Sequence, residues 1–197
     1  MNNLVTNAPT CVSVINNFNP VKMTIKILYL FLALLSCPLM AQNLTPEEQE
    51  LYLLIDQYRK EKGLPSIPLS VSLTYVAQLH VKDLNENYIS SNKCNAHSWS
   101  SKGNWTSCCY TSDHAQAKCM WDKPSELTKY KGYGYEIAYW NSNKAKPFES
   151  LEGWKSSPGH NEVIINQGPW NSEWNAIGIG LSGNYSVVWF GMEIDDN

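Results

Sequence analysis

Hydrophobic side chains recur with a helical period over residues 46–63, which is the clearest pattern in the chain. The repeating positions are Leu51, Leu54, Ile55 and Tyr58. Their spacing of i, i+3, i+4 and i+7 places them on one face of a helix. Thr45 begins a Thr-Pro-Glu-Glu capping box, and Gly63 ends the pattern. The sequence therefore predicts an amphipathic helix between these two residues.

A second helix is predicted to begin near Ser70 or Ser72. Its apolar stripe consists of Leu73, Val76, Ala77, His80 and Leu84. Buried polar groups are normally hydrogen-bonded, so the position of His80 on this stripe predicts a buried histidine bonded to a neighbour. We therefore leave His80 out of the predicted site.

The second half of the chain predicts one more helix and a hairpin. Phe148, Leu151 and Trp154 form an apolar stripe on a helix that Pro147 opens and Pro158 closes. Residues 174–181 and 185–191 read as two strands joined by a short loop that contains Gly183. Because helices come first and paired strands last, we expect an α+β fold in which helices cover a small antiparallel sheet.

Residues 1–41 read as a leader, and residues 42–197 as a single domain. Lys22 and Lys26 precede an apolar run over 27–35, and a small residue, Ala41, follows at the expected cleavage site of a secretory signal peptide. The run is too short to span a bilayer, which disfavours an uncleaved anchor. Met23 is a plausible true start, and lipidation of Cys37 is the weaker alternative because Pro38 follows it. We expect a secreted, extracellular or periplasmic protein.

The charge of the chain excludes one class of partner. The formal net charge is −3 and no basic cluster is present, so the sequence carries no electrostatic footprint for nucleic acid. We expect a monomer without a membrane span.

Four cysteines outside the leader, Cys94, Cys108, Cys109 and Cys119, predict two disulfides, as is typical of exported chains. A bond between the adjacent Cys108 and Cys109 would close a strained ring, so we expect one of them to pair with Cys94 and the other with Cys119. The alternative is a zinc site that includes His97 or His114. Disulfides would stabilise the loop 90–123, which shows no hydrophobic period.

Two histidines and a glutamate, His97, Glu136 and His160, are the candidates for chemistry. Imidazoles bind zinc-like ions, and a carboxylate fixes a tautomer or holds a water. Glu136 follows Tyr135 in an aromatic segment, where a carboxylate should be partly desolvated and so need a partner or titrate at a raised pKa. The alternative is that all three are ordinary surface residues.

Four motifs follow one another along the chain: the segments 95–98 (Asn-Ala-His-Ser), 134–138 (Gly-Tyr-Glu-Ile-Ala) and 154–160 (Trp-Lys-Ser-Ser-Pro-Gly-His), and the Gly/aromatic hairpin 177–191. Together they resemble the CAP family of SCP-like extracellular proteins, and its bacterial branch in particular. The resemblance implies an α-β-α sandwich in which His97, Glu136 and His160 face one cleft beside Tyr135.

Two departures from the family pattern concern this cleft. Ile137 replaces the asparagine that usually follows the first glutamate, and Ser157 stands where many members carry a second glutamate. Glu149, Glu152 and Glu162 lie nearby but do not match by motif. The four-residue constellation is therefore reduced to three, which weakens the prediction of tight zinc binding.

Three functions remain open at this point. The first is a secreted module that binds a small ligand, lipid, peptide or cell-surface partner, because family members are linked to such roles and have no general catalytic activity. The second is a metal-dependent hydrolase in which His97 and His160 bind zinc and Glu136 acts as general base. The third is a disulfide-stabilised structural protein. The sequence contains neither H-E-x-x-H nor G-x-S-x-G, which favours the first.

Overall fold

The computed structural model describes residues 44–88, 91 and 93–196. The predicted leader, with Met23, Cys37 and Ala41, lies outside the described residues and stays a prediction. Within the described part of the chain, no helix has the length and apolar character needed to cross a membrane.

Helices α2 (Pro46–Glu61) and α3 (Val71–Asn87) confirm the first two predicted helices. At the start of α2, the hydroxyl of Thr45 accepts from the amide of Glu48, and the Glu48 carboxylate accepts from the amide of Thr45, which completes the capping box. The side chain of Ser70 caps α3 by accepting from the Leu73 amide at 2.9 Å. All five predicted stripe residues of α3, including His80, are buried.

Three antiparallel strands form the sheet in the order β1-β3-β2. They are β1 (Tyr135–Trp140), β2 (Ala176–Ser182) and β3 (Tyr185–Gly191). The β2-β3 hairpin is confirmed, although β2 begins at Ala176 and not at the predicted residue 174. β1 pairs with β3 and places Glu136 opposite Trp189. The central strand is therefore β3, and β1 lies at an edge.

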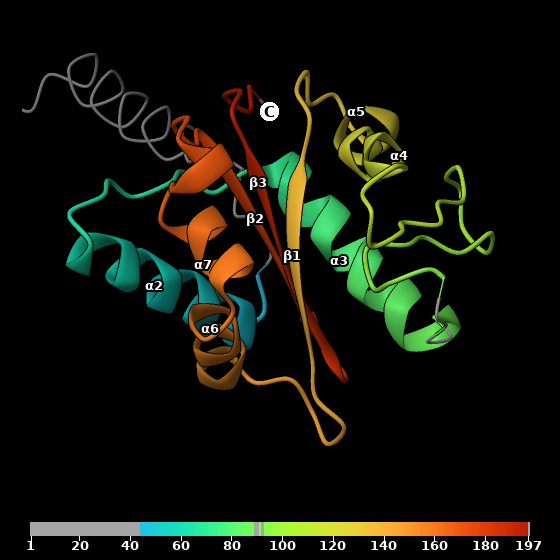
Figure 1. Ribbon diagram of the computed structural model, residues 1–197, viewed down its shortest axis with the longest axis horizontal. Coiled ribbons are helices and arrows are strands. Elements are labelled where there is room, and N and C mark those ends of the chain that lie inside the picture. The colour runs from blue at the N-terminus through green and yellow to red at the C-terminus, as the bar shows by residue number, and fades with distance from the viewer. Residues whose placement is uncertain (1–43, 89–90, 92, 197) are drawn as a thin grey trace, which may run out of the picture. The chain divides into compact units, whose positions relative to one another are not determined.

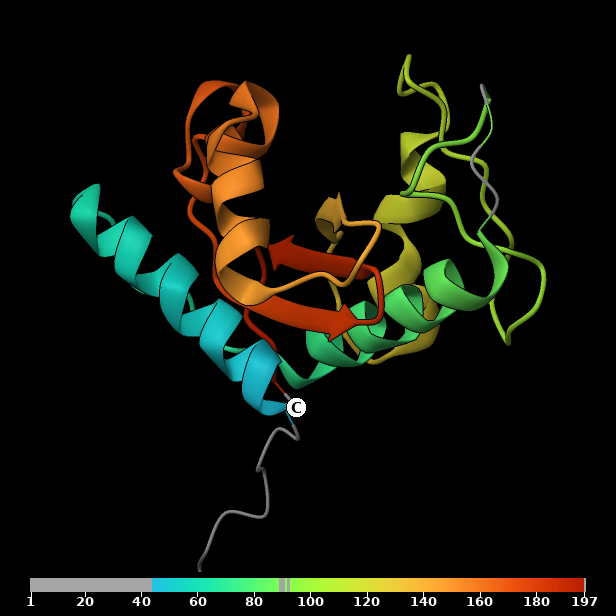
Figure 2. The same cartoon turned by 90° about the horizontal axis from the view of Figure 1, so that it is seen from below.

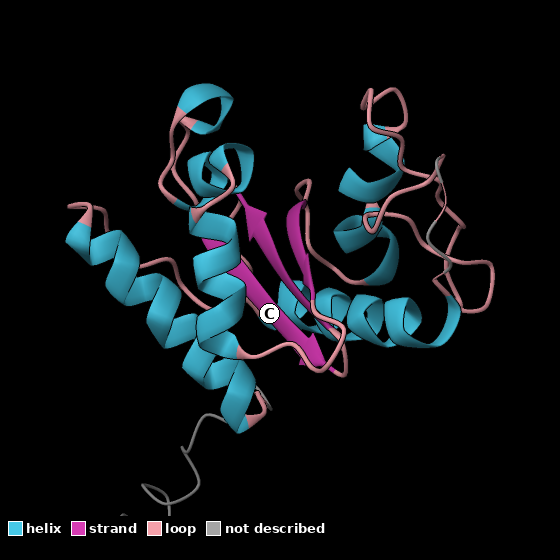
Figure 3. Ribbon diagram, turned by 60° about the horizontal axis from the view of Figure 1, so that its bottom comes forward, coloured by secondary structure: helices cyan, strands magenta, loops and turns pink. Residues whose placement is uncertain are grey.

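Helices cover both faces of this sheet, which confirms the α-β-α sandwich (Figure 1). One core combines α2, α6 (Pro147–Lys155) and α7 (Pro158–Ile164) with sheet residues such as Ile137 and Ile179. A second core combines α3 and the disulfide loop with Val187 and Trp189. Figure 2 shows the hairpin strands between α2 and α3, and Figure 3 shows the same separation of the two helical layers.

Two glycines of β2 explain how closely α3 approaches the sheet. A Cβ atom at Gly178 would lie 2.1 Å from the carbonyl carbon of Leu73, and one at Gly180 would lie 2.4 Å from the carbonyl oxygen of Ala77. Only glycine leaves room for helix backbone at such distances. The alternating Ile and Gly of this strand therefore place isoleucines against α2 and α6 and bare backbone against α3.

The structure adds to and corrects the predicted helices. The helix that begins at Pro147 ends before Pro158, as predicted, but Pro158 also begins α7, so His160 lies on a second short helix. Proline is favoured in the first turn, where its missing N–H has no intrahelical partner. Phe148 is 61% exposed and does not belong to the core stripe. The aperiodic loop also contains a short helix, α4 (Ala117–Trp121), and α5 (Lys123–Leu127) follows it directly.

The four cysteines form two disulfides, as predicted, and the structure decides the pairing. Cys94 bonds to Cys109, and Cys108 bonds to Cys119. The alternative use of these cysteines as zinc ligands is therefore wrong. The first bond closes the loop that carries His97, and the second joins this loop to α4. Both bonds thus stabilise the segment of chain that reaches over the edge of the sheet.

Candidate functional site

The structure brings Glu136 and His97 into direct contact, although 39 positions separate them in sequence. Oε1 of Glu136 lies 2.7 Å from Nδ1 of His97. Strand alternation turns Glu136 and Ala138 toward the α3 face of the sheet, opposite to Ile137. His97 is held by the loop after α3, where its amide donates to the side chain of Asn95 at 3.0 Å.

A third group, His80, completes the hydrogen bonding of Glu136. Nδ1 of His80 bonds to Oε2 of Glu136, and Nε2 of the same ring lies 3.0 Å from the carbonyl oxygen of Ser98. The expectation of a buried, hydrogen-bonded His80 is confirmed, but its partner is the central residue of the candidate site. Nothing in the sequence indicates this contact, because no local spacing relates α3 to β1.

Burial and charge act in opposite directions on Glu136, whose side chain is 0% exposed. Desolvation alone would raise the pKa of this carboxyl, but the charges and hydrogen bonds of His80 and His97 outweigh it and lower the pKa below its usual value. Glu136 is therefore ionised at neutral pH and acts as an acceptor. Since both oxygens already bond to imidazoles, its geometry favours a positioning role over that of a general base.

His160 lines the same cavity as His97 but makes a separate contact. Nδ1 of His160 shares a hydrogen bond of 2.9 Å with the hydroxyl of Ser157, the residue that precedes α7. Burial lowers the pKa of His160, and the nearby His97 lowers it further. His160 is therefore neutral at pH 7. Ser157, which stands where many members of the resembled family carry a second glutamate, supplies a neutral hydroxyl at this point.

A cavity of about 440 Å³ lies against these residues. Side chains from both faces of β1 border the cavity, because β1 is an edge strand. Glu136 lies on one face and Tyr135 on the other. Tyr135 also contacts Trp121 of α4 and Trp170, with ring centroids 5.6 and 5.1 Å away. His97, Glu136, His160 and Tyr135 thus line one cavity with an aromatic wall.

No set of three His, Cys, Asp or Glu side chains in the described part of the chain is arranged to hold a metal ion. Glu136 is committed to two imidazoles, which leaves His97, His114 and His160 as the nitrogen donors at the cavity, and Nδ1 of His114 already shares a hydrogen bond with the hydroxyl of Tyr110. Glu149 and Glu152 bond to surface partners, Asn141 and Lys155 respectively, and neither they nor Glu162 lines the cavity. The donor set does not fit a structural zinc site, which takes four ligands.

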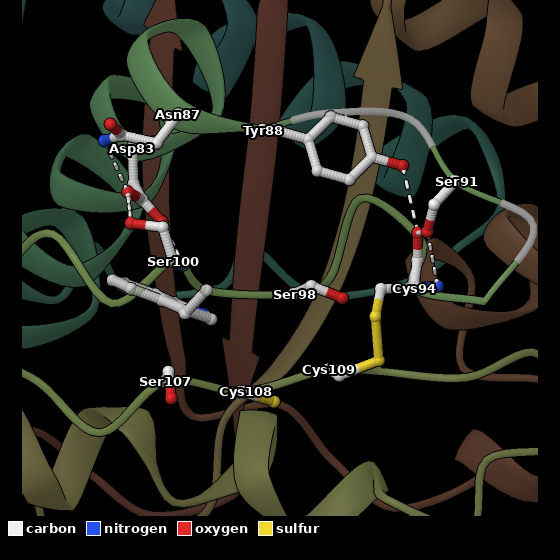
Figure 4. Close-up of a pocket in the computed structure, with 11 residues that line it drawn as sticks. Asp83, Asn87, Tyr88, Ser91, Cys94, Ser98, Ser100, Ser107, Cys108 and Cys109 are labelled. Carbon is white, nitrogen blue, oxygen red and sulfur yellow. Dashed lines mark hydrogen bonds between the residues drawn. A yellow bond between two sulfur atoms is a disulfide. The ribbon is translucent and has the colours of Figure 1, made fainter.

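A second cavity, of about 280 Å³, lies between the end of α3 and the disulfide loop (Figure 4). Asp83 accepts from the amide of Ser100 at 2.8 Å and from Asn87 at 2.9 Å, while the hydroxyl of Tyr88 donates to the carbonyl of Cys94. These polar groups satisfy one another and attach the loop to α3. Cys94, Cys108 and Cys109 border this space, but none of the predicted cleft residues, His97, Glu136, His160 and Tyr135, does, so we assign it to the scaffold.

The order of the elements, the sandwich and the histidine-lined cavity define a CAP-type domain. The model of the cysteine-rich secretory protein family (CAP) matches residues 52–188, and the chain belongs to this family. No curated protein matches the chain at a significant level.

Solved structures of bacterial proteins share the fold. An outer surface protein from Borrelia burgdorferi is 19% identical, with a TM-score of 0.50 over 74% of this chain and 91% of that protein. An extracellular protein with an SCP domain from Bacillus anthracis is 18% identical, with a TM-score of 0.53 over 76% of this chain but 44% of that protein. At such identities the likeness concerns the fold alone.

Proposed function

We propose that this protein is an exported binding module whose cavity takes a neutral small molecule with a largely apolar body. The observation that carries the proposal is the composition of the cavity wall. Rings of Trp121, Tyr135 and Trp170 stand beside the neutral His160 and Ser157, and the described lining includes neither lysine nor arginine. Aromatic walls bury ligand area at small entropic cost, and a few polar groups fix orientation.

The charge of the site favours neutral over ionic ligands. An anion would lie near the buried, ionised Glu136 without a lysine or arginine to compensate for its desolvation. A cation would find no free carboxylate to pair with, because both oxygens of Glu136 are bonded to imidazoles. A neutral ligand that presents polar groups to the histidines avoids both costs, and neutral lipids, peptides and cell-wall fragments all offer such chemistry.

Export is the second part of the proposal. The two disulfides require an oxidising compartment, and the predicted secretory leader would deliver the chain there. We propose a secreted or periplasmic location, in keeping with the extracellular protein from Bacillus anthracis that shares the fold.

Intrinsic tryptophan fluorescence can test the binding function, because Trp121 and Trp170 line the cavity. A sterol, a short peptide with blocked termini and a neutral cell-wall sugar, an N-acetylglucosamine oligomer, should be titrated separately, and at least one should give a saturable change. Tyr135→Ala should weaken that binding about 5-fold or more, since a buried aromatic contact is worth more than about 1 kcal/mol. Tyr75→Ala, an exposed tyrosine on α3 away from this cavity, is the matched control. Unchanged fluorescence with all three probes would refute the proposal.

A further inference from the structure

The ring of His80 is enclosed between the sheet and the disulfide loop, with both of its nitrogens bonded. Its side chain is 0% exposed and stacks on Trp99 with ring centroids 4.3 Å apart and planes 6° from parallel. Nδ1 faces the carboxylate of Glu136, and Nε2 faces the carbonyl oxygen of Ser98. The function proposed above assigns no part to this residue.

Both partners of His80 are hydrogen-bond acceptors. A backbone carbonyl has no proton to give, and an ionised carboxylate has none either. A neutral imidazole carries a proton on one nitrogen only, so it would leave one of these two contacts as a pair of facing lone pairs. Both contacts are satisfied when both nitrogens of His80 carry protons. The parallel stacking on Trp99 also stabilises a positive ring, because an indole face attracts a cation.

We propose that His80 is a buried imidazolium that positions the Glu136 carboxylate and thereby fixes the tautomer of His97. With Oε2 held by His80, Oε1 is the oxygen left to accept from Nδ1 of His97. The proton of His97 is then on Nδ1, and its Nε2 carries a lone pair. His80 also holds the carbonyl of Ser98, the next residue after His97, so it fixes both the ring partner and the backbone of His97.

The other charged groups near this ring have partners of their own. Asp83, one turn further along α3, accepts from Ser100 and Asn87. Lys123 lies 5.6 Å from the centre of the Trp99 ring and donates to Glu126 and to the carbonyl of Thr106. Within the described residues, Glu136 is thus the carboxylate that pairs with the charge of His80.

A fixed tautomer of His97 determines which ligands the cavity can recognise. If the cavity binds a ligand as proposed above, a group that meets Nε2 of His97 must bring a hydrogen-bond donor, such as a hydroxyl or an amide N–H. His80 would then determine specificity without touching the ligand. The tautomer is a property of the free protein, so its measurement does not depend on the ligand proposal.

Nitrogen-15 NMR of the histidine side chains tests this directly, because the chain contains four histidines and each can be assigned by a single His→Gln variant. In the free wild-type protein at pH 7, both nitrogens of His80 should give imidazolium-type signals. His97 should give a protonated Nδ1 and a pyridine-type Nε2. A pyridine-type nitrogen on His80, or a protonated Nε2 on a neutral His97, would overturn the proposal.

Two variants separate positioning from mere packing. His80→Phe keeps a flat ring against Trp99 but has no donor, so the Nε2 signal of His97 should shift from the pyridine-type position toward the average of two tautomers. His80→Gln retains an amide donor for Glu136 and should preserve the wild-type tautomer of His97. An unchanged His97 spectrum in His80→Phe would refute the positioning role. If His80→Phe does not fold, the comparison of His80→Gln with the wild-type protein still tests the positioning role. Loss of the wild-type His97 tautomer in His80→Gln would also contradict that role.

Discussion

Removal of the Glu136 carboxylate should destabilise the domain strongly, because it leaves two imidazoles without their acceptor. The side chains of Glu136 and His80 are both 0% exposed, and that of His97 is 19% exposed. Hydrogen bonds to charged groups contribute about 1.5–3 kcal/mol each, and breaking a buried ion pair costs about 3–5 kcal/mol. We therefore expect Glu136→Leu to lower the free energy of unfolding by about 3–5 kcal/mol.

The double variant gives the sharper result. In His80→Phe/Glu136→Leu both charges are gone and apolar side chains replace them, so the loss should be at least about 1 kcal/mol smaller than the sum of the two single losses. Urea unfolding of the oxidised protein at pH 7, followed by tryptophan fluorescence and circular dichroism, measures all four free energies.

A surface carboxylate provides the control for this cycle. Glu152 is 44% exposed and pairs with Lys155, so Glu152→Leu should change the free energy of unfolding by no more than about 0.5 kcal/mol. A loss below about 1 kcal/mol for Glu136→Leu, or strictly additive single losses, would show that His80 and Glu136 do not form a coupled buried pair.

Four further predictions concern pH, packing and metal. His160 has a lowered pKa in the folded state, so the unfolded chain binds more protons than the folded chain below pH 6.5. The free energy of unfolding should therefore fall as the pH drops below this value. His160→Gln should flatten this part of the stability–pH curve. Glu136 also has a lowered pKa in the folded state, so its contribution to stability is complete above pH 4.5 and is lost as the pH falls further. Glu136→Gln should remove this pH dependence. Gly178→Ala should cost about 3 kcal/mol or more in urea unfolding, since its Cβ would overlap the α3 backbone; a stable variant would contradict the close approach. Calorimetry should show no tight, stoichiometric zinc binding, and a tight site lost in both His97→Ala and His160→Ala would instead favour the metal-dependent hydrolase.

Local chemistry made much of this fold predictable. The capping box at Thr45, the α3 stripe and the Gly-containing hairpin each depend on neighbours in sequence, and all three are confirmed. The possible pairings of the four cysteines could be narrowed to two, because adjacent cysteines cannot easily bond to each other. Which pairing forms depends on the path of the loop across α3, and the sequence carries no pattern for that path.

The candidate site was predictable only in part. The resemblance to the CAP family predicted that His97 and Glu136 face one cleft, and the structure places Nδ1 of His97 2.7 Å from Oε1 of Glu136. The part played by His80 was missed because its position on an apolar stripe indicates burial but not a partner. The contact between His80 on α3 and Glu136 on β1 arises only from the three-dimensional packing of the sandwich. A histidine on an apolar stripe and a glutamate among aromatic residues each indicate burial, but neither sign indicates that the two are in contact.

The arrangement of the disulfides has a practical consequence for anyone who makes this protein. Cys108 and Cys109 are neighbours whose bonds run to different partners, one of them on α4, which supplies Trp121 to the cavity wall. In a reducing cytosol neither bond persists, and in recombinant material from that compartment the wall of the cavity formed by this loop and α4 loses its covalent ties. Samples intended for ligand screening should therefore come from a periplasmic or secreted expression route, with free thiols assayed first.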